Sequence, residues 1–148
     1  MRLTQYTDFS LRVLIYLALR PERRCTIREI SEAYAISHNH LMKVVQKLAN
    51  EGFVHSTRGV GGGLNLARKP ADIVIGDVVR CMEPDLGLVE CMRPENQCVI
   101  TSVCALAGML VDSRKAFLAV LDDHTLDQIV SPQRASALAN RLNIRIAS

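Results

Sequence analysis

The sequence predicts a mainly α-helical winged helix-turn-helix fold with a small β-hairpin wing and a long dimerisation helix. Three observations predict it: two short helices joined by a tight turn, a glycine-rich hairpin directly after them, and a long helical pattern near the carboxyl end. The 148 residues, 49% of them hydrophobic, suit one compact domain with a modest extension. Residues 1–70 form the predicted helix-turn-helix and wing region, 71–104 a connecting helix and cysteine loop, and 105–148 a dimerisation helix and tail.

Composition and charge restrict the partners and the location of the chain. The net charge of +3 is too small to indicate a nucleic-acid partner by itself, but most of the Lys and Arg residues precede Lys69. The amino end has no secretion signal, and the longest apolar runs fall far below the roughly 18 residues that span a bilayer. We therefore expect a soluble cytoplasmic protein without a membrane partner. Its five cysteines are expected to be reduced or metal-bound, with a disulfide scaffold as the alternative.

The first two predicted helices follow from periodicity and capping. Apolar residues at helical spacing, Tyr6 and Phe9 among them, predict an amphipathic helix over residues 4–19, which Pro21 ends. Thr26 and Glu29 have the spacing of a capping box, in which each side chain binds a backbone amide at the start of a helix. A second, short helix is therefore predicted to run to Tyr34.

A third helix is predicted between a capping residue, Ser37, and a left-handed stop, Gly52. Its apolar face consists of Leu41, Val44, Val45 and Leu48. The tight turn that joins it to the second helix gives the spacing of a helix-turn-helix motif.

The opposite face of the third helix is polar and suits contact with DNA. It presents His38, Asn39, His40, Lys43, Gln46 and Lys47. The amino end of a recognition helix lies nearest the base edges of the major groove. We therefore expect its first three residues to contact bases and the two lysines to contact phosphates. Ser37 belongs to the same predicted contact set. From this helix alone, an ordinary solvated face is the alternative.

Residues 53–57 and 64–67 are predicted to pair as a β-hairpin with a glycine-rich tip, which is the predicted wing. Arg58 at the tip can enter the minor groove, where negative potential is concentrated, and Gly61 and Gly62 let the backbone approach DNA closely. A phosphate-cradling loop of a nucleotide enzyme is a competing interpretation, but no Lys-Ser or Lys-Thr follows the glycines. A merely structural hairpin is the other alternative.

The carboxyl half has a helical pattern. A short helix is predicted over residues 73–83, and a long helix of about 19 residues, ~28 Å in length, precedes the tail. The apolar stripe of the long helix must be covered, and we expect a second copy of the chain to cover it; packing within its own chain is the alternative. Tail helices are predicted to start at Thr125 and at residues 131–132, with Leu138 and Leu142 as anchors.

Three of the cysteines, Cys91, Cys98 and Cys104, lie in one short Pro-interrupted stretch with the spacing C-x6-C-x5-C. Neighbouring thiolates repel one another unless a cation holds them, so these residues are predicted metal ligands. Soft thiolates suit an iron-sulfur cluster, Zn or Cu(I), and three of them leave at least one coordination position to another residue. Cys25 and Cys81 are expected to be small buried hydrophobes.

Several motifs together resemble those of one family. They are Met1-Arg2-Leu3-Thr4 with Tyr6-Thr7-Asp8, Ser37-His38-Asn39-His40-Leu41, the wing Arg58-Gly59-x-Gly61-Gly62, Ile75-Gly76-Asp77-Val78-Val79-Arg80 and the three cysteines. From residue 1 to about residue 130 the chain resembles the iron-sulfur winged-helix transcription regulators typified by IscR and NsrR. Within that family it is most similar to the nitric-oxide-sensing NsrR-type repressors.

That resemblance implies a homodimeric repressor, not an enzyme, that binds a palindromic operator on double-stranded DNA and senses nitric oxide. It implies that the three cysteines bind an iron-sulfur cluster, 4Fe-4S in preference to 2Fe-2S, and that Asp8 of the partner subunit is the fourth ligand. IscR-like members have a His three residues after the third cysteine, where this chain has Ala107, which argues against that branch. From the residues alone, Asp8 is a helix-start residue stabilised by the helix dipole.

Three alternatives are retained. A redox- or iron-responsive member of the same family differs only in its signal. A zinc-site DNA-binding regulator differs in its metal and would be colourless. A small thiol enzyme or electron carrier would use the cysteines for turnover and would not need a recognition helix and a wing.

Overall fold

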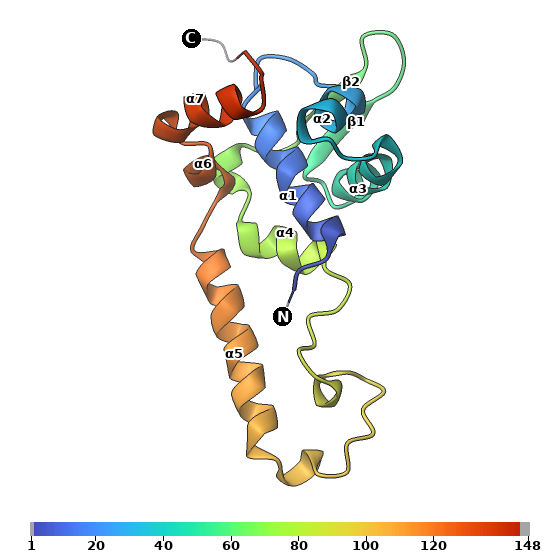
Figure 1. Cartoon of the computed structure of the whole chain (residues 1–148), viewed down its shortest axis with the longest axis vertical. Coiled ribbons are helices and arrows are strands. Elements are labelled where there is room, and N and C mark those ends of the chain that lie inside the picture. The colour runs from blue at the N-terminus through green and yellow to red at the C-terminus, as the bar shows by residue number, and fades with distance from the viewer. Residues whose placement is uncertain (1, 146–148) are drawn as a thin grey trace.

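The computed structural model describes residues 2–145 and confirms a mainly helical fold with a two-stranded antiparallel hairpin. Figure 1 shows a head, which contains most of the helices and the hairpin, and an arm, which is formed by the longest helix and the loop before it and points away from the head. Met1, the first residue of the amino-terminal motif, and residues 146–148, the end of the predicted tail, lie outside the described residues.

The elements follow the predicted order. The helices are α1 (Gln5–Ala18), α2 (Ile27–Tyr34), α3 (His38–Asn50), α4 (Ile75–Met82), α5 (Ala105–Asp122), α6 (Leu126–Ile129) and α7 (Pro132–Arg141). The strands are β1 (Val54–Thr57) and β2 (Gly63–Leu66), and short 3-10 turns occupy Pro70–Asp72, Glu90–Met92 and Thr101–Val103. None of the described helices is long and apolar enough to cross a membrane.

Helix α1 is the central element of the head and packs against α3, α4, α6 and β2. Its buried face includes Val13, Leu14 and Leu17, as the helical periodicity predicts. Thr4 is its N-cap, and the Thr4 hydroxyl accepts the Thr7 amide. The predicted span of 4–19 therefore includes one capping residue at each end of the observed helix.

The helix-turn-helix is built largely as predicted. The capping box of Thr26 and Glu29 is present at the start of α2, and the left-handed Ala35 (φ 52°) turns the chain toward α3. Ser37 is the N-cap of α3, but its hydroxyl makes no capping hydrogen bond among the described residues. Gly52 follows α3 with φ 72°, as expected for a left-handed stop.

The hairpin is shorter than predicted by one residue at each outer end, because only Val54–Thr57 and Gly63–Leu66 pair in register. Cys25 extends it on the other side of β2: its amide and carbonyl exchange hydrogen bonds of 2.9 and 2.7 Å with Leu64. A Cβ at Gly63 would lie 2.9 Å from the Cys25 carbonyl oxygen, so this close approach requires glycine. The wing is therefore tied to the segment before α2.

Helix α4 joins the arm to the head. In its last turn, the Arg80 guanidinium donates two hydrogen bonds of 2.6 Å to the Asp122 carboxylate at the end of α5. A Cβ at Gly76 would lie 1.9 Å from the same carboxylate, so only glycine admits this contact. The Ile75 amide also donates to the His124 carbonyl.

The carboxyl-terminal elements also match the prediction in outline. α5 has 18 residues, none of them buried. Thr125 is the N-cap of α6, and Ser131 and Pro132 start α7. Leu138 and Leu142 are only half-buried, whereas Ala139 is 2% exposed and is the residue of α7 that enters the core. The core position of α7 is thus taken by a small residue, which the spacing of the leucines did not predict.

A buried acid, Glu83, fastens the two helices that organise the head. It follows α4 directly, and its carboxylate accepts hydrogen bonds from the Thr4 amide, the Thr4 hydroxyl and the Thr7 hydroxyl, the last at 2.5 Å. The amide donor belongs to the N-cap of α1, where a negative charge is also favoured by the helix dipole. Glu83 thus joins the start of α1 to the end of α4.

Replacing Glu83 with Ala should destabilise the fold by roughly 2 kcal/mol, because three donors lose their acceptor and Thr7 is fully buried. The free energy of unfolding from urea titration measures this effect. Glu32→Ala is the control, since that exposed carboxylate pairs with Arg28 on the helix surface and its loss should cost below about 0.5 kcal/mol. Equal losses in the two variants would contradict a special role for Glu83.

Candidate nucleic-acid interface and cysteine loop

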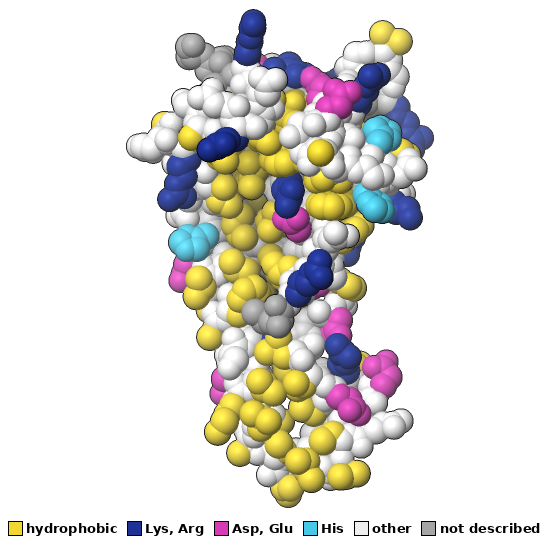
Figure 2. Space-filling model, in the orientation of Figure 1, with side chains coloured by type: hydrophobic (Ala, Val, Ile, Leu, Met, Phe, Trp, Pro, Cys, Tyr) yellow, Lys and Arg dark blue, Asp and Glu magenta, His cyan; other side chains and the backbone are white. Residues whose placement is uncertain are grey.

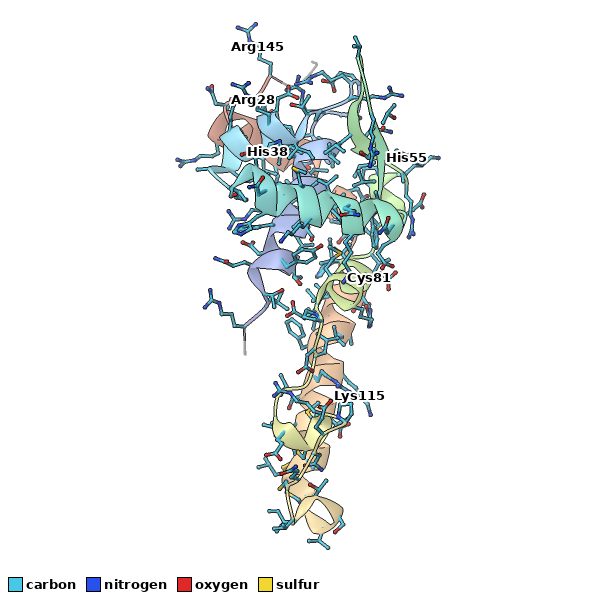
Figure 3. All side chains as sticks on the ribbon, turned by 90° about the vertical axis from the view of Figure 1, so that its right-hand side faces the viewer. Arg28, His38, His55, Cys81, Lys115 and Arg145 are labelled. Carbon is cyan, nitrogen blue, oxygen red and sulfur yellow. The ribbon has the colours of Figure 1, made fainter. Side chains whose placement is uncertain are left out.

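One face of the head presents the residues predicted to contact DNA from α3. The apolar side of α3 is buried against the head, and the helix lies across the surface in Figure 3. The exposed side carries Ser37, His38, Asn39, His40 and Lys43, with Lys47 half-buried at its edge. All the predicted α3 residues are therefore at least partly accessible at the surface of the head.

The wing lies beside α3, since β1 packs on that helix. Arg58 and Gly61 at its tip are exposed, and Gly62 is half-buried. The Gly62 amide donates to the Gly59 carbonyl at 2.9 Å, and a Cβ on Gly62 would lie 2.3 Å from the Thr57 carbonyl oxygen. The tight tip thus depends on glycine, and it holds Arg58 outward.

Two arginines support this face in ways that the sequence did not reveal. Arg24 donates to the Gly61 carbonyl at 3.3 Å and so contacts the tip of the wing. Arg68 donates to the carbonyls of Glu51 and Gly52 at the end of α3, and its guanidinium lies 4.8 Å from the centre of the Phe53 ring. The Arg23-Arg24 pair before the capping box was the available signal for the first of these contacts.

Arg23, by contrast, has a structural partner. It donates to Glu29 at 2.5 Å, and this hydrogen bond is the main cause that lowers the pKa of Glu29 to about 2. The Glu29 carboxylate also accepts the Thr26 amide at 2.6 Å. The ion pair therefore stabilises the start of α2 rather than adding a free cation to the interface.

The first turns of α1 lie directly beside α3. The Tyr6 hydroxyl donates to the Lys43 carbonyl at 2.7 Å, and the Lys47 ammonium lies 5.9 Å from the centre of the Tyr6 ring. The centres of the Phe9 and His40 rings are 6.4 Å apart. Helical periodicity placed Tyr6 and Phe9 in the apolar stripe of α1, and no sequence signal indicated that they contact the polar residues of α3.

The three clustered cysteines lie in the arm, on the loop between α4 and α5. Cys91 belongs to the 3-10 turn Glu90–Met92, Cys98 is exposed, and Cys104 ends the turn Thr101–Val103 and is the N-cap of α5. All three are free thiols, and Cys91 and Cys104 are partly exposed. Among residues 2–145 no group of three or more His, Cys, Asp or Glu lies close enough to hold a metal ion, so the ligand set stays a prediction.

The loop is braced by its own polar side chains rather than by a core. Glu90 accepts the Gln97 amide at 2.9 Å, and Asn96 accepts the Cys98 amide at 2.9 Å. The Thr101 hydroxyl donates to the Cys98 carbonyl at 2.8 Å. These local bonds hold the stretch around Cys98 in a turn whose exposed thiol can approach a metal without unfolding a core.

The donor set fits a thiophilic metal centre. Three accessible thiols on one loop supply soft ligands, and the remaining cysteines do not compete with them. Burial raises the pKa of the Cys25 thiol and of the Cys81 thiol, which favours their neutral, non-ligating form. As predicted, Cys25 is fully buried; Cys81 is half-buried on α4 against the core.

Asp8 lies in the first turn of α1 and not beside the cysteines of its own chain. Its carboxylate binds the Arg12 guanidinium through two contacts of 2.8 and 3.1 Å, and both side chains are nearly half exposed. Such a surface pair contributes little to stability. The Asp8 carboxylate is therefore accessible to a partner outside its own chain.

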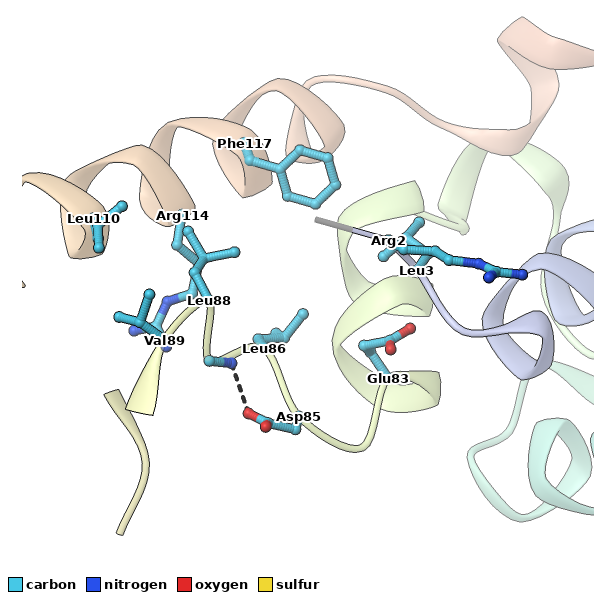
Figure 4. A pocket seen from close by; sticks show the side chains of 11 residues that line it. Arg2, Leu3, Glu83, Asp85, Leu86, Leu88, Val89, Leu110, Arg114 and Phe117 are labelled. Atoms are coloured by element: carbon cyan, nitrogen blue, oxygen red, sulfur yellow. Dashed lines mark hydrogen bonds between the residues drawn. The ribbon is translucent and has the colours of Figure 1, made fainter. Parts of the chain in front are cut away.

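A cavity of about 330 Å³ lies at the root of the arm, between α5 and the loop that follows α4 (Figure 4). Leu110 and Phe117 of α5 form part of its apolar lining. The carboxylates at its edge are engaged within the chain: Glu83 with α1, and Asp85 with the Gly87 amide at 2.6 Å. The cavity therefore offers an apolar wall rather than a catalytic acid.

Known proteins are similar to this chain in sequence over most of its length. A family model described as Rrf2, iron-dependent transcriptional regulator, matches residues 3–132. The HTH-type transcriptional regulator NsrR of Bacillus subtilis is 51% identical over 132 residues, which cover 88% of this chain and 90% of that protein. NsrR of Geobacillus kaustophilus is 46% identical over 138 residues, 92% of this chain and 93% of the relative. These names agree with the prediction of a regulator that is not an enzyme.

Solved structures share the fold. CymR, the global cysteine regulator of B. subtilis, aligns with a TM-score of 0.72 at 28% identity and covers 88% of this chain and 97% of its own. IscR of T. potens aligns with a TM-score of 0.73 at 23% identity, over 92% of this chain and 90% of its own. The predicted winged helix-turn-helix fold is thereby confirmed.

Proposed function

The chain belongs to the Rrf2 family of transcriptional regulators, and on that premise we propose that it is a homodimeric DNA-binding repressor whose iron-sulfur cluster senses nitric oxide and controls operator affinity. The observation that carries this function is the combination, in one chain, of an exposed polar α3 face and a loop with three accessible thiols. Both relatives described above are named NsrR, and the motifs predict a repressor of the NsrR type.

The head provides the DNA-binding surface. In this proposal His38, Asn39 and His40, at the start of α3, contact base edges in the major groove. The cationic Lys43 and Lys47 follow them and contact phosphates, together with the Ser37 hydroxyl, which makes no capping bond among the described residues. The wing contributes Arg58 to the minor groove, and its glycines bring backbone amides close to the sugar-phosphate chain.

The arm provides the dimer contact. Hydrophobic side chains gather over it in Figure 2, and among them Val103 is 84% exposed, Met109 64% and Val120 60%. An exposed apolar surface along an 18-residue helix indicates a protein contact. Burying such a surface is favourable by about 25 cal/mol for each Å² removed from water. A second copy of the chain offers the same apolar stripe, so a two-fold pairing of the α5 helices buries both.

The dimer determines the form of the operator. Two-fold symmetry places the two α3 helices in successive major grooves, so the expected site is a palindrome on double-stranded DNA. Its half-sites should lie about one helical turn, ~34 Å, apart.

The cysteine loop provides the sensor. Cys91, Cys98 and Cys104 would hold the cluster, 4Fe-4S in preference to 2Fe-2S, and Asp8 of the partner subunit would supply the fourth ligand. A bound cluster supplies iron that binds nitric oxide, and a carboxylate is a weaker match for that iron than a thiolate, which leaves one position open to attack. The exposed Asp8 carboxylate supports this role, because its pair with Arg12 can be exchanged at little cost.

Signal and affinity are coupled through α1. Asp8 belongs to the same helix as Tyr6 and Phe9, which contact α3, so making or breaking the bond between Asp8 and a partner's site displaces the start of α1. A coupling free energy of about 1.4–3 kcal/mol changes operator affinity by about 10- to 150-fold, which is within the strength of one ligand bond.

A second candidate is an iron-responsive or redox-responsive repressor with the same site, and the family description as an iron-dependent regulator favours it. It differs only in the signal that removes or alters the cluster. A zinc site on the same cysteines is the third candidate, and absence of visible absorption would identify it because zinc thiolates are colourless.

Arg58→Ala should weaken operator binding and lower the slope of log affinity against log salt concentration by about 0.9, the value for one lost phosphate contact. If Arg58 acts mainly in the minor groove, the preference for a narrow groove falls as well. Fluorescence anisotropy at several salt concentrations measures both. An unchanged slope together with unchanged operator preference would reject the role of the wing.

Cys98→Ala should yield a colourless protein with an unchanged helical spectrum, because removing one thiolate opens the cluster site while the exposed side chain adds nothing to the core. Anaerobic purification followed by iron and sulfide analysis and a visible spectrum provides the measurement. Cys81→Ala is the matched control and should keep the chromophore. A coloured Cys98→Ala protein that still responds to nitric oxide would exclude Cys98 as a ligand.

A further inference from the structure

We infer that Tyr6 and Phe9 of α1 are positioning residues for DNA binding: they hold α3 at the residues that contact the operator. This inference rests on the proposed function only in taking α3 as the recognition helix. The contacts come from a different helix and involve three of the assigned residues: the side chains of His40 and Lys47 and the backbone carbonyl of Lys43.

Tyr6 holds α3 in two ways. Its hydroxyl donates a hydrogen bond of 2.7 Å to the Lys43 carbonyl in the second turn of α3. The face of its ring attracts the Lys47 ammonium, 5.9 Å from the ring centre. Burial raises the pKa of Tyr6, so the phenol keeps the proton that it donates. One aromatic side chain thereby fixes both the backbone of α3 and the direction of one lysine.

Phe9 lies one turn further along α1 and contacts the ring of His40 at 6.4 Å with an interplanar angle of 31°. The Arg12 guanidinium also packs on this aromatic group, 5.9 Å from the centre of the Phe9 ring and 5.8 Å from the centre of the Tyr34 ring. His40 is exposed, so without Phe9 its imidazole would sample several rotamers in water. The contact selects among those rotamers before DNA arrives.

Core packing also holds α1 against α3, through buried residues of both helices such as Leu14 and Val44. The contacts of Tyr6 and Phe9 lie at the edge of that packing, around an open groove of about 190 Å³ lined by Gln5, Tyr6, Phe9, His40, Lys43 and Val44. Because side chains that border an open groove are not held by close packing on all sides, specific contacts from α1 determine where the exposed residues of α3 point. The Tyr6 hydrogen bond, at 2.7 Å, also fixes the α3 backbone at this point.

The consequence is preorganisation. If α1 holds the backbone and two side chains of α3 in the free protein, DNA binding does not have to order them. The same turn of α1 carries Asp8, so a displacement at Asp8 acts on Lys43 through Tyr6 without passing through the core of the head. The start of α1 thus positions the DNA-contacting residues of α3 and is also part of the sensor.

Tyr6→Phe isolates the hydroxyl, since the ring and its contact with Lys47 are kept. We expect the affinity of the dimer for its operator to fall about threefold to tenfold, the range for one hydrogen bond, with the salt slope unchanged because no phosphate contact is lost. Amides in the middle of α3 should exchange with deuterium faster in the free protein. Phe9→Leu should lower the affinity for the intact operator. The loss should be smaller for an operator altered at the bases nearest His40, because His40 makes no specific contact there.

Tyr34→Phe is the matched control, because it removes a hydroxyl from another aromatic residue beside α1, one whose ring packs against Tyr16 and Arg12 of α1. It should change neither affinity nor exchange. The inference is overturned if Tyr6→Phe binds within twofold of the wild type with unchanged exchange in α3. A salt slope lowered by about 0.9 would overturn it too, since Tyr6 would then contact a phosphate itself. If the wild-type protein binds no operator, the proposed function fails, and the exchange measurement still decides whether Tyr6 holds α3.

Discussion

The hydrogen bonds of the buried Glu83 carboxylate fix the two helices on which every other part of the molecule depends. They join the first turn of α1 to the residue that follows α4, at the point where the chain leaves the head for the arm. α1 in turn supports α3, and α4 supports α5 through the Arg80–Asp122 pair. A carboxylate at this position is favoured by the helix dipole and by three donors, which together offset the cost of burying its charge.

This arrangement gives a short physical route between the cysteine loop and the DNA-binding face. The route runs along the chain from the loop to Glu83, then through the hydrogen bonds that Thr4 and Thr7 at the start of α1 donate to Glu83. From α1 it continues through the hydrogen bond that Tyr6 donates to the Lys43 carbonyl of α3. Discrete contacts have two alternatives, made or broken, and therefore suit a switch better than a continuously deformable core does. The exposed apolar side of α5 supports the complementary proposal that the arms of two chains pair.

Local chemistry was sufficient to predict most of the fold. The capping box at Thr26 fixed the start of α2, and Gly52 fixed the end of α3, because both depend on residues within one turn. Contacts between distant positions could not be predicted: Glu83 and Thr4 are 79 residues apart, and Gly76 meets Asp122 only after α4 and α5 have packed. The predicted DNA-contacting residues are all at least partly exposed, but within residues 2–145 the cysteines do not form a group close enough to hold a metal. Metal binding can itself order its ligands, so the spacing of the cysteines does not determine the geometry of a site.

Anaerobic titration with nitric oxide, with visible absorption and operator affinity recorded on the same dimeric sample, tests the central claim most directly. If the cluster governs the affinity, the absorption of the iron-bound protein should fall together with operator binding, and the two curves should share one stoichiometry. The claim would be contradicted by a protein that stays monomeric and free of iron after reconstitution. It would also be contradicted by operator affinity that is unchanged while the absorption is lost.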